Sequence, residues 1–355
     1  MKGLILSGGF GTRLRPLTHT SAKQLIPVAN KPILHYAIEA LKRSGIKDIG
    51  IVVGDTKEEI KAAIGTGKDF GVKITYIEQE KPLGLAHAVK ISKKFIKDEP
   101  FVMYLGDNIL KDGIFDFVET FRKKKSNANI LLTRVPHPEN FGVAELDRSG
   151  KVVKLTEKPK NPKSNLALVG VYIFDKNIFK AVEKIKPSSR NELEITDAIQ
   201  WLIDNGFAVI SHEVSGWWKD TGKPEDILEA NQLILEDIVG KIEGKVDKDS
   251  EISGRVVIEK GAEIVKSQLR GPLIIGAGSK IIRSYIGPFT SIGNSVKIES
   301  SEIEHSIILP ESEIIGIQGR IDQSLIGRGV KIVSRRTKPS THKFVLGDRS
   351  DIVLA

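Results

Sequence analysis

A glycine-rich turn near the start of the chain has the residue types needed to bind phosphate. In order, the turn contains Gly8, Gly9, Gly11, Thr12 and Arg13. Glycine lacks a Cβ atom, so the backbone can bend sharply and a phosphate can approach bare N–H groups. The guanidinium groups of Arg13 and Arg15 add fixed positive charge beside these amides. The pattern predicts an oligophosphate-binding loop, with a glycine-rich turn that binds no ligand as the alternative.

Two familiar phosphate-binding loops do not match this turn. A Walker loop requires Gly-Lys-Ser/Thr after its glycines, and no such triplet follows here. A dinucleotide-binding loop requires a further glycine three residues after Gly11, where the chain has Leu14. The turn is therefore expected to belong to another class of nucleotide site.

An acidic residue, Asp107, directly follows the apolar run 100–105 and one glycine. This run has the length and composition of a buried strand. Ligands bind at the carboxyl ends of the strands in open, parallel α/β sheets. Asp107 is therefore a candidate metal ligand, with helix capping as the alternative.

The segment after the glycine turn, 21–32, contains Lys23 and Gln24 within the sequence Lys-Gln-Leu-Ile-Pro. The turn itself reads Gly-Gly-x-Gly-Thr-Arg-Leu-x-Pro-x-Thr. Together they resemble the signature of the sugar-1-phosphate nucleotidylyltransferases, and within that family the glucose-1-phosphate thymidylyltransferases. Specific motifs carry the resemblance over residues 1–235. Departures from the family pattern stand at Ala29, His87, Val169 and Lys219.

The resemblance implies a Mg²⁺-dependent reaction in which dTTP and glucose 1-phosphate give dTDP-glucose and pyrophosphate, for sugar-nucleotide synthesis of the dTDP-rhamnose type. Arg13 and Lys23 would hold the β- and γ-phosphates of the nucleotide. Asp107 and Asp220 would hold the magnesium ion against the α-phosphate, Asp220 being the acid of Trp-x-Asp-Thr-Gly. No general base is needed, because a phosphate monoester has its second pKa near ~6 and is already anionic.

Other positions of the family pattern imply contacts with the base and the sugar. Gln79 and Gly84 would contact the nucleobase, since an amide offers a donor and an acceptor to the imide edge of thymine or uracil. Gly142 and Glu157 would bind sugar hydroxyls, and Lys158 would bind the sugar phosphate. The remaining implied substrate-binding residues are Gly8, Gly9, Gly11, Thr12, Gln24, Pro82 and Tyr172. No metal or catalytic role is expected for His87, which has no second histidine or acid at helical ligand spacing.

Three alternatives stay open. A uridylyltransferase using UTP would need the same residues, because uracil lacks only one methyl group, worth ~1–3 kcal/mol in a pocket. A bifunctional N-acetylglucosamine-1-phosphate uridylyltransferase and acetyltransferase would use the C-terminal part, where His305 is a candidate base. A non-catalytic regulatory subunit need not retain these cations and acids, and this chain has them.

Composition excludes several other classes of protein. The chain has 355 residues, 40% of them hydrophobic, and no cysteine, which predicts two domains without disulfides or thiolate zinc sites. No apolar segment approaches the ~20 residues of a membrane span. The first apolar run ends at Leu6, which is too short for a signal peptide. We therefore expect a cytoplasmic protein without a membrane partner. Abundant lysine and isoleucine with only two methionines favour a thermophile source.

The net charge of +9 does not by itself indicate a nucleic-acid partner. Lysine and arginine are spread along the chain, and only 6% of the residues are aromatic. The densest basic run, 122–125, is expected at the end of a helix, where cations interact favourably with the helix dipole. No nucleic-acid partner is predicted.

The elements that position the candidate residues alternate between strand and helix over residues 1–238. This alternation predicts an α/β, Rossmann-like nucleotidyltransferase domain with a mostly parallel sheet covered on both faces. One helix is expected to begin at Pro32 and to present Leu34, Ile38 and Leu41 on one face, with Gly45 ending it.

The second predicted domain, residues 239–355, has a different pattern. Its apolar residues recur every 17 positions in three sets: Leu269, Ile286 and Ile303; Ile275, Ile292 and Leu309; Ile281, Ile298 and Ile315. A coil of three short rungs with one inward side chain per rung gives this period, which is typical of a left-handed β-helix of hexapeptide repeats. We expect this domain to have a structural role and to form a homo-oligomer.

Overall fold

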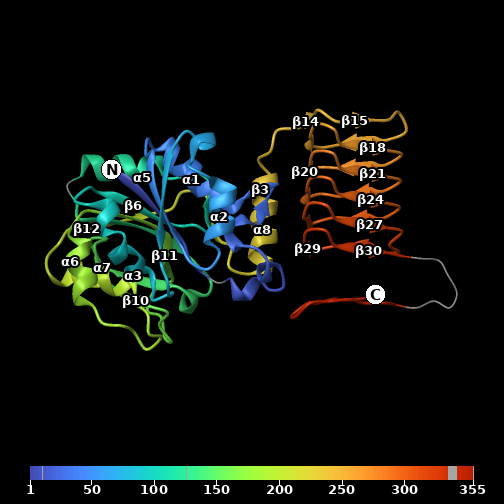
Figure 1. Ribbon diagram of the computed structural model, residues 1–355. Helices are drawn as coiled ribbons and strands as arrows, with labels where there is room; N and C mark the ends of the chain where they lie inside the picture. The colour runs from blue at the N-terminus through green and yellow to red at the C-terminus, as the bar shows by residue number, and fades with distance from the viewer. Residues whose placement is uncertain (10, 125, 335–341, 355) are drawn as a thin grey trace. The chain divides into compact units, whose positions relative to one another are not determined.

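The computed structural model describes residues 1–9, 11–124, 126–334 and 342–354 (Figure 1). The chain forms two compact units. The first contains residues 1–10, 21–25 and 33–220, and the second contains residues 11–20, 26–32 and 221–355. The domain boundary drawn from the sequence between residues 238 and 239 stays a prediction.

The first unit is built on a nine-stranded sheet. Its strands are β1 (Lys2–Ser7), β4 (Asp48–Val53), β5 (Lys73–Glu78), β6 (Phe101–Leu105), β8 (Ala128–Arg134), β9 (Gly142–Leu146), β10 (Val152–Glu157), β11 (Leu166–Phe174) and β12 (Val209–Glu213). Strands β6, β1, β4 and β5 are parallel neighbours in that order. Strand β11 pairs antiparallel with β6, β8 and β9, and β12 pairs parallel with β8. The predicted α/β fold is confirmed, and the parallel strands β6, β1, β4 and β5 come from the N-terminal half of this unit.

Helices cover both faces of this sheet. They are α1 (Ile33–Arg43), α2 (Lys57–Ile64), α3 (Leu85–Ile91), α4 (Lys93–Ile96), α5 (Phe115–Lys123), α6 (Ile178–Lys184) and α7 (Ile195–Asp204), with short 3₁₀ turns at Lys23–Leu25, Lys68–Phe70 and Pro138–Asn140. Successive side chains of a strand point to opposite faces, so Leu4 and Leu6 join one hydrophobic core and Ile5 joins the other. The apolar face that the sequence predicted for α1 packs in the same core as Ile5. This face consists of Leu34, Ile38 and Leu41.

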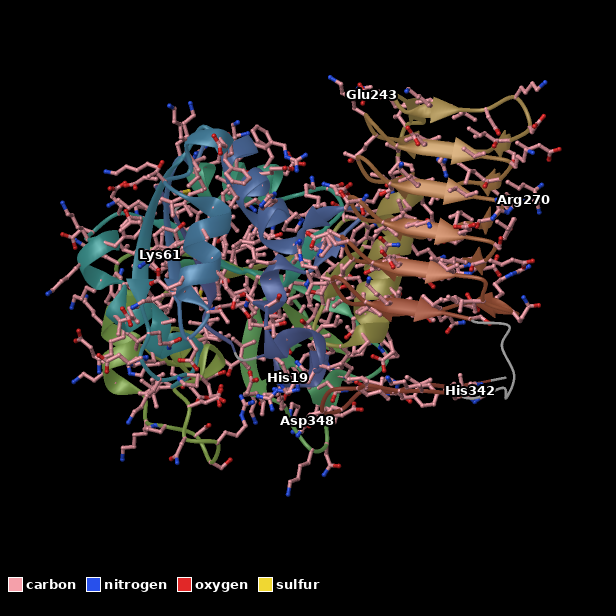
Figure 2. The ribbon with its side chains drawn as sticks, turned by 45° about the vertical axis from the view of Figure 1, so that its right-hand side comes forward. His19, Lys61, Glu243, Arg270, His342 and Asp348 are labelled. Carbon is pink, nitrogen blue, oxygen red and sulfur yellow. The ribbon has the colours of Figure 1, made fainter. Side chains whose placement is uncertain are left out.

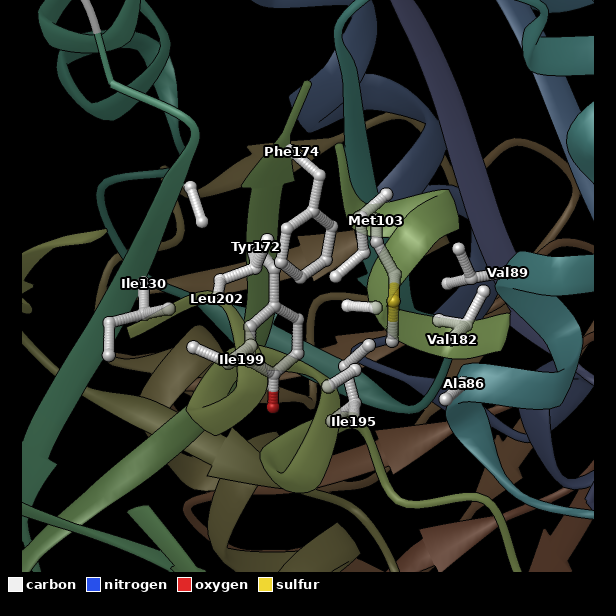
Figure 3. Packing of buried hydrophobic residues seen from close by; sticks show 14 of the residues in the cluster. Ala86, Val89, Met103, Ile130, Tyr172, Phe174, Val182, Ile195, Ile199 and Leu202 are labelled. Carbon is white, nitrogen blue, oxygen red and sulfur yellow. The ribbon is translucent and has the colours of Figure 1, made fainter. Parts of the chain in front are cut away.

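The core that contains Leu4 lies beneath α3, α6 and α7. Figure 3 shows Tyr172 and Phe174 of β11 in this core beside Met103 of β6 and Ile199 of α7. The rings of Tyr172 and Phe174 stack with their centroids 5.9 Å apart. Tyr172 is almost fully buried, so close packing holds this part of the sheet rigidly in place.

The second unit contains three parallel sheets that fit a left-handed β-helix. The first holds β14 (Lys241–Ile242), β17 (Val256–Ile258), β20 (Leu273–Ile275), β23 (Thr290–Ile292), β26 (Ile307–Ile308) and β29 (Leu325–Ile326). The second holds β15 (Lys245–Val246), β18 (Glu263–Val265), β21 (Lys280–Ile282), β24 (Lys297–Glu299), β27 (Glu313–Ile315) and β30 (Lys331–Val333). The third holds β16 (Glu251–Ser253), β19 (Gln268–Arg270), β22 (Tyr285–Ile286), β25 (Glu302–Ile303) and β28 (Arg320–Ile321).

The second unit also includes helix α8 (Pro224–Leu235), the short strands β2 (Pro27–Val28) and β3 (Lys31–Pro32), and 3₁₀ turns at Thr12–Leu14 and Leu17–His19. The amide oxygen of Asn231 on α8, which is fully buried, accepts from the N–H of Ala29 at 2.9 Å and from the hydroxyl of Ser291 at 2.6 Å. The amide nitrogen of Asn231 donates to the carbonyl of Phe289 at 2.9 Å. This buried amide therefore ties α8 and the segment 26–32 to the β-helix.

The coils stack as the 17-residue period predicted, with Leu269, Ile286 and Ile303 in register in the third sheet. The prediction that Leu309 and Ile315 continue the other two sets is wrong by one residue. The structure instead buries Ile308 and Ile314 and pairs them with the preceding coil. The corner after Ile303 is one residue shorter than the corresponding corner of the coil before it, and this moves both positions.

Charged side chains cover the outside of the coils. Figure 2 shows Arg270 and Glu243 directed away from the β-helix, and Lys61 on α2 of the first unit. Helix α5 ends at Lys123, as expected for the basic run 122–125, whose last residue lies outside the described part of the chain. None of the helices described here has the length and hydropathy of a membrane span.

Candidate active site

The glycine turn begins where β1 ends, at the carboxyl end of the parallel strands. Gly8 and Gly9 belong to the first unit. A Cβ atom on Gly8 would lie 3.1 Å from the amide oxygen of Gln79, and one on Gly9 would lie 3.7 Å from Cε of Lys23. The absence of these side chains therefore lets Gln79 and Lys23 approach the backbone of the turn.

The remaining predicted turn residues lie in segment 11–20 of the second unit. Gly11 has φ 59°, a left-handed conformation that favours glycine, and it precedes the 3₁₀ turn that contains Thr12 and Arg13. The hydroxyl of Thr18 donates to the carbonyl of Gly11 at 2.7 Å, which closes this segment on itself. Thr12 and Arg13 are exposed, and Phe10 lies outside the described residues.

Lys23 and Asp107 form an ion pair between the 3₁₀ turn Lys23–Leu25 and the end of β6. Asp107 Oδ1 also accepts a hydrogen bond from Nδ2 of Asn108 at 3.0 Å. Burial raises the pKa of Asp107, but the charge and hydrogen bond of Lys23, together with Asn108, outweigh burial and hold this pKa below its usual range. Asp107 is therefore ionised at neutral pH.

A short ladder of two strands brings the second predicted acid to the same place. Strand β7 (Asn108–Leu110) pairs antiparallel with β13 (Trp218–Asp220), and Asp220 stands opposite Asn108, the residue after Asp107. Oδ1 of Asn108 accepts from Nε1 of Trp218 at 2.6 Å. The amide of Asn108 therefore connects the carboxylate of Asp107 to the strand that carries Asp220.

These two carboxylates suit a magnesium ion. Mg²⁺ binds through one or two protein carboxylates and completes its octahedral shell with waters and substrate phosphates. Asp107 and Asp220 supply oxygen ligands only, and the ammonium of Lys23 shows that Asp107 already stabilises a cation at this point. The donor set therefore fits the group that the sequence predicted.

Gln79 and Gly84 come together at one side of the glycine turn. Gln79 is 8% exposed, and its Nε2 lies 3.4 Å from the carbonyl oxygen of Gly84 and 3.0 Å from Nδ1 of His87. Gly84 has φ 100°, and a Cβ atom there would lie 2.5 Å from the carbonyl oxygen of Leu193. Only glycine fits at position 84, whereas Pro82, two residues earlier, is exposed.

Two buried polar atoms beside this turn have no partner among the described residues. They are Oγ of Ser7 and Oε1 of Gln24, whose residues are fully and almost fully buried. A buried acceptor without a hydrogen bond costs ~1–3 kcal/mol. A ligand that donates to Gln24 would recover this free energy, which makes the predicted residue a good candidate for substrate contact.

The predicted sugar-binding residues lie together at the ends of β9 and β10. Gly142 stands opposite Glu157, and a Cβ atom on Gly142 would lie 3.2 Å from Oε2 of Glu157 and 2.7 Å from the side chain of Thr196. Burial and the charge of Glu194 raise the pKa of Glu157. Burial and then the charge of Glu157 raise the pKa of Tyr172, which lies almost fully buried in the core beneath this site.

Lys158 and Arg190 add positive charge beside Glu157. Lys158 is exposed and has φ 41°, a strained backbone conformation for a lysine and one that is typical of functional sites. Nη2 of Arg190 lies 3.2 Å from Oε1 of Glu157 and 2.9 Å from both carboxylate oxygens of Glu194. The sequence prediction missed Arg190, although it stands directly before the Asn-Glu-Leu-Glu motif.

Asn108 and Trp218 are further residues that the sequence prediction did not assign. The side chain of Asn108 closely approaches Gly170, which lies within β11. Oδ1 of Asn108 accepts from the N–H of Gly170 at 3.2 Å, and a Cβ atom on Gly170 would lie 2.5 Å from that oxygen. Asn108 therefore fixes the loop after β6 to β11.

The β-helix holds one separate cluster of titratable side chains. Among the described residues, Glu304, His305 and Asp322 place possible ligand atoms within 4.8 Å of one another. Nδ1 of His305 lies 3.2 Å from Oδ1 of Asp322, while Glu304 accepts from Nη1 of Arg320 at 2.6 Å. The fixed charge of Arg320 opposes the binding of a divalent cation here.

Comparisons with known proteins find similar sequences and a similar fold. The model of the nucleotidyl transferase family matches residues 2–237. A glucose-1-phosphate thymidylyltransferase of Streptomyces antibioticus is 56% identical over 353 residues, which cover 99% of each chain. The low-salt glycan biosynthesis nucleotidyltransferase Agl11 of Haloferax volcanii is 52% identical over 358 residues, which cover 100% of each chain. A solved structure of UDP-glucose pyrophosphorylase with UDP-glucose is 25% identical, with a TM-score of 0.61, and matches 67% of this chain and 99% of that one.

Proposed function

Because the chain belongs to the nucleotidyl transferase family, we propose that it transfers a nucleotidyl group from dTTP to glucose 1-phosphate and forms dTDP-glucose and pyrophosphate. The relative from Streptomyces antibioticus supports this pair of substrates, since it is similar over almost the whole of both chains. The observation that carries the proposal is the convergence of Lys23, Asp107 and Asp220 at the carboxyl end of the parallel strands.

In this mechanism, an oxygen of the sugar phosphate attacks the α-phosphorus of the nucleotide, and pyrophosphate leaves from the opposite side. The attacking oxygen is already anionic at neutral pH. The enzyme therefore has to position the two substrates and stabilise charge, and it needs no general base.

Each charged residue then has a defined task. Lys23 and Arg13 hold the β- and γ-phosphates, and Lys23 leaves Asp107 when the triphosphate arrives. Asp107 and Asp220 would hold Mg²⁺, which supplies positive charge to the phosphate oxygens when it is bound. Gly8, Gly9, Gly11 and Thr12 let the phosphates approach backbone amides.

The other predicted residues recognise the base and the sugar. Gln79, Gly84 and Gln24 line the nucleotide side, where the unpaired oxygen of Gln24 accepts a hydrogen bond from the nucleotide, with Pro82 at the rim. On the sugar side, Glu157 and Tyr172 contact sugar hydroxyls beside Gly142. Lys158 binds the sugar phosphate, and Arg190 keeps Glu157 in place.

The test is pyrophosphate release with glucose 1-phosphate and each of dTTP, UTP, ATP, CTP and GTP. We expect turnover with dTTP, and a dTDP-glucose product identified by mass spectrometry. A preference for UTP would assign the uridylyltransferase alternative. Failure with every triphosphate in the presence of Mg²⁺ would overturn the proposal and favour the regulatory alternative.

For the β-helix we propose a structural role in a homo-oligomer rather than acetyl transfer. A groove of about 620 Å³ on this unit is lined by residues that include Lys266 and Tyr285. Incubation with acetyl-CoA and glucosamine 1-phosphate should give no acetylated product. Light scattering should give a mass of at least twice the 39.0 kDa of one chain, and a mass of one chain would contradict the oligomer.

A further inference from the structure

The amide of Gln79 is held by contacts on its nitrogen side. Its Nε2 lies 3.0 Å from Nδ1 of His87, and the carbonyl oxygen of Gly84 lies at the longer distance of 3.4 Å. The opposite end of the amide, Oε1, faces the glycine turn at Gly8. The N–H of Gln79 donates to the carbonyl of Val53 at 2.9 Å, so the backbone of this residue is fixed as well.

His87 has a rigid position from which to hold this amide. It lies in the first turn of α3, whose start is anchored to residue 193 by two backbone hydrogen bonds. The N–H of Ala86 donates to the carbonyl of Leu193 at 3.0 Å, and the N–H of Leu193 donates to the carbonyl of Leu83 at 2.8 Å. The backbone that carries His87 is therefore held in place by the fold, and the ring nitrogen Nδ1 lies within hydrogen-bond distance of Gln79.

The imidazole of His87 is neutral at pH 7, because burial and the charge of Lys90 lower its pKa. A neutral imidazole has one nitrogen that accepts a hydrogen bond and one that donates. When Nδ1 accepts from Nε2 of Gln79, the ring carries its proton on Nε2. The amide of Gln79 then cannot rotate by 180° without placing its oxygen against the lone pair of Nδ1.

We propose that His87 is a positioning residue that fixes the amide of Gln79, so that Oε1 rather than Nε2 reads N3 of the nucleobase. This inference rests on the proposed function. Thymine and uracil carry a hydrogen on N3 that Oε1 accepts, whereas N3 of cytosine is itself an acceptor and repels Oε1. His87 would thereby select imide-containing bases without touching the nucleotide.

The experiment compares dTTP with dCTP as nucleotide in steady-state pyrophosphate release, using His87→Phe and His87→Gln. Phenylalanine keeps a planar ring and removes the acceptor, whereas glutamine restores an acceptor oxygen. For His87→Phe we expect the ratio of kcat/KM for dTTP to that for dCTP to fall about tenfold or more. A hydrogen bond that distinguishes two substrates contributes at least this factor to selectivity. The kcat at saturating dTTP should change little, because the phosphate-binding residues are intact.

The variant His87→Gln should retain most of the selectivity, and Lys94→Gln, an exposed change on α4, should retain all of it. Unchanged selectivity in His87→Phe, or equal losses in His87→Phe and His87→Gln, would overturn the proposal. Circular dichroism and thermal unfolding show whether each variant is folded.

A second measurement uses the wild-type chain and does not depend on turnover. The ¹⁵N chemical shifts of His87, assigned by the resonances that His87→Gln lacks, report which ring nitrogen carries the proton. We expect the tautomer with hydrogen on Nε2, and a hydrogen on Nδ1 would contradict the proposed orientation. If no triphosphate is turned over, the proposed function fails while this measurement still decides the contact between His87 and Gln79.

Discussion

The side chains of Lys23 and Asp107 form an ion pair, although 84 residues separate them in the chain. Both side chains are mostly buried, so the pair is shielded from water and salt. In the absence of nucleotide, the ammonium thus neutralises the carboxylate that would hold magnesium. Binding of a magnesium–triphosphate complex would provide each of the two groups with a new partner of opposite charge.

Lys23→Ala should lower kcat by more than ~100-fold, because a cation that stabilises the transferring phosphates contributes at least this much. The control is Lys61→Ala on α2, where the lysine makes a surface ion pair with Glu58 at 3.3 Å and lies over the ring of Tyr76. Steady-state pyrophosphate release measures both variants. Near-normal turnover of Lys23→Ala would remove this residue from the mechanism.

Removal of divalent cations should abolish turnover, and added Mg²⁺ should restore it. Asp220→Asn should raise the Mg²⁺ concentration for half-maximal rate by more than ~10-fold, because Mg²⁺ requires carboxylate ligands and a neutral amide binds it weakly. The exposed Asp116→Asn on α5 serves as the control for a lost negative charge. Full activity after treatment with EDTA would exclude the proposed metal site.

The pH dependence of sugar binding should follow Glu157. Its pKa is raised by burial and by Glu194, and its ionised form accepts stronger hydrogen bonds from sugar hydroxyls than the protonated acid does. The value of kcat/KM for glucose 1-phosphate should therefore fall as the pH decreases through this raised pKa. Glu194→Gln removes a negative charge, lowers the pKa of Glu157 and should move the acidic limb to lower pH.

The matched control for this shift is Glu192→Gln. Glu192 also lies near Arg190, with its carboxylate 3.6 Å from Nη2, but it does not contribute to the raised pKa of Glu157. The substrate phosphate titrates equally in all three proteins, so the difference between the profiles isolates the carboxylate. Identical acidic limbs in wild type and Glu194→Gln would contradict the assignment.

Gly84→Ala should destabilise the first unit and raise KM for the nucleotide. The added Cβ atom would lie 2.5 Å from the carbonyl oxygen of Leu193, and φ at this position is 100°. We expect a loss of more than ~2 kcal/mol in the free energy of unfolding. Gly113 also has a positive φ, 69°, but no atom lies within 4 Å of an added Cβ, so Gly113→Ala should cost only ~1 kcal/mol.

The corrected register of the β-helix predicts different costs for two neighbouring residues. Ile308→Ala should cost ~2–4 kcal/mol, because Ile308 is buried between coils. Leu309→Ala should cost less than ~1.5 kcal/mol, since Leu309 is partly exposed at a corner. Thermal unfolding of the two variants measures the difference, and a larger loss in Leu309→Ala would support the original 17-residue register.

The sequence by itself determined the class of fold and the kinds of group in the candidate site. Alternating strand and helix patterns and the period of the tail reflect side-chain burial within single elements, which local sequence specifies. The glycines of the turn and Asp107 were identified because phosphate binding and metal binding need particular residue types at strand ends, whereas Lys23 was assigned by the resemblance of its segment to the family signature.

Only the tertiary structure decided which groups meet. The pair of Lys23 with Asp107, the position of Asp220 opposite Asn108, and the contact of His87 with Gln79 each depend on how separate elements pack. Sequence patterns do not contain these distances, because pairing across strands is set by packing of the whole sheet. The shift from Leu309 to Ile308 has the same origin: a corner one residue shorter is visible only when the coils are stacked.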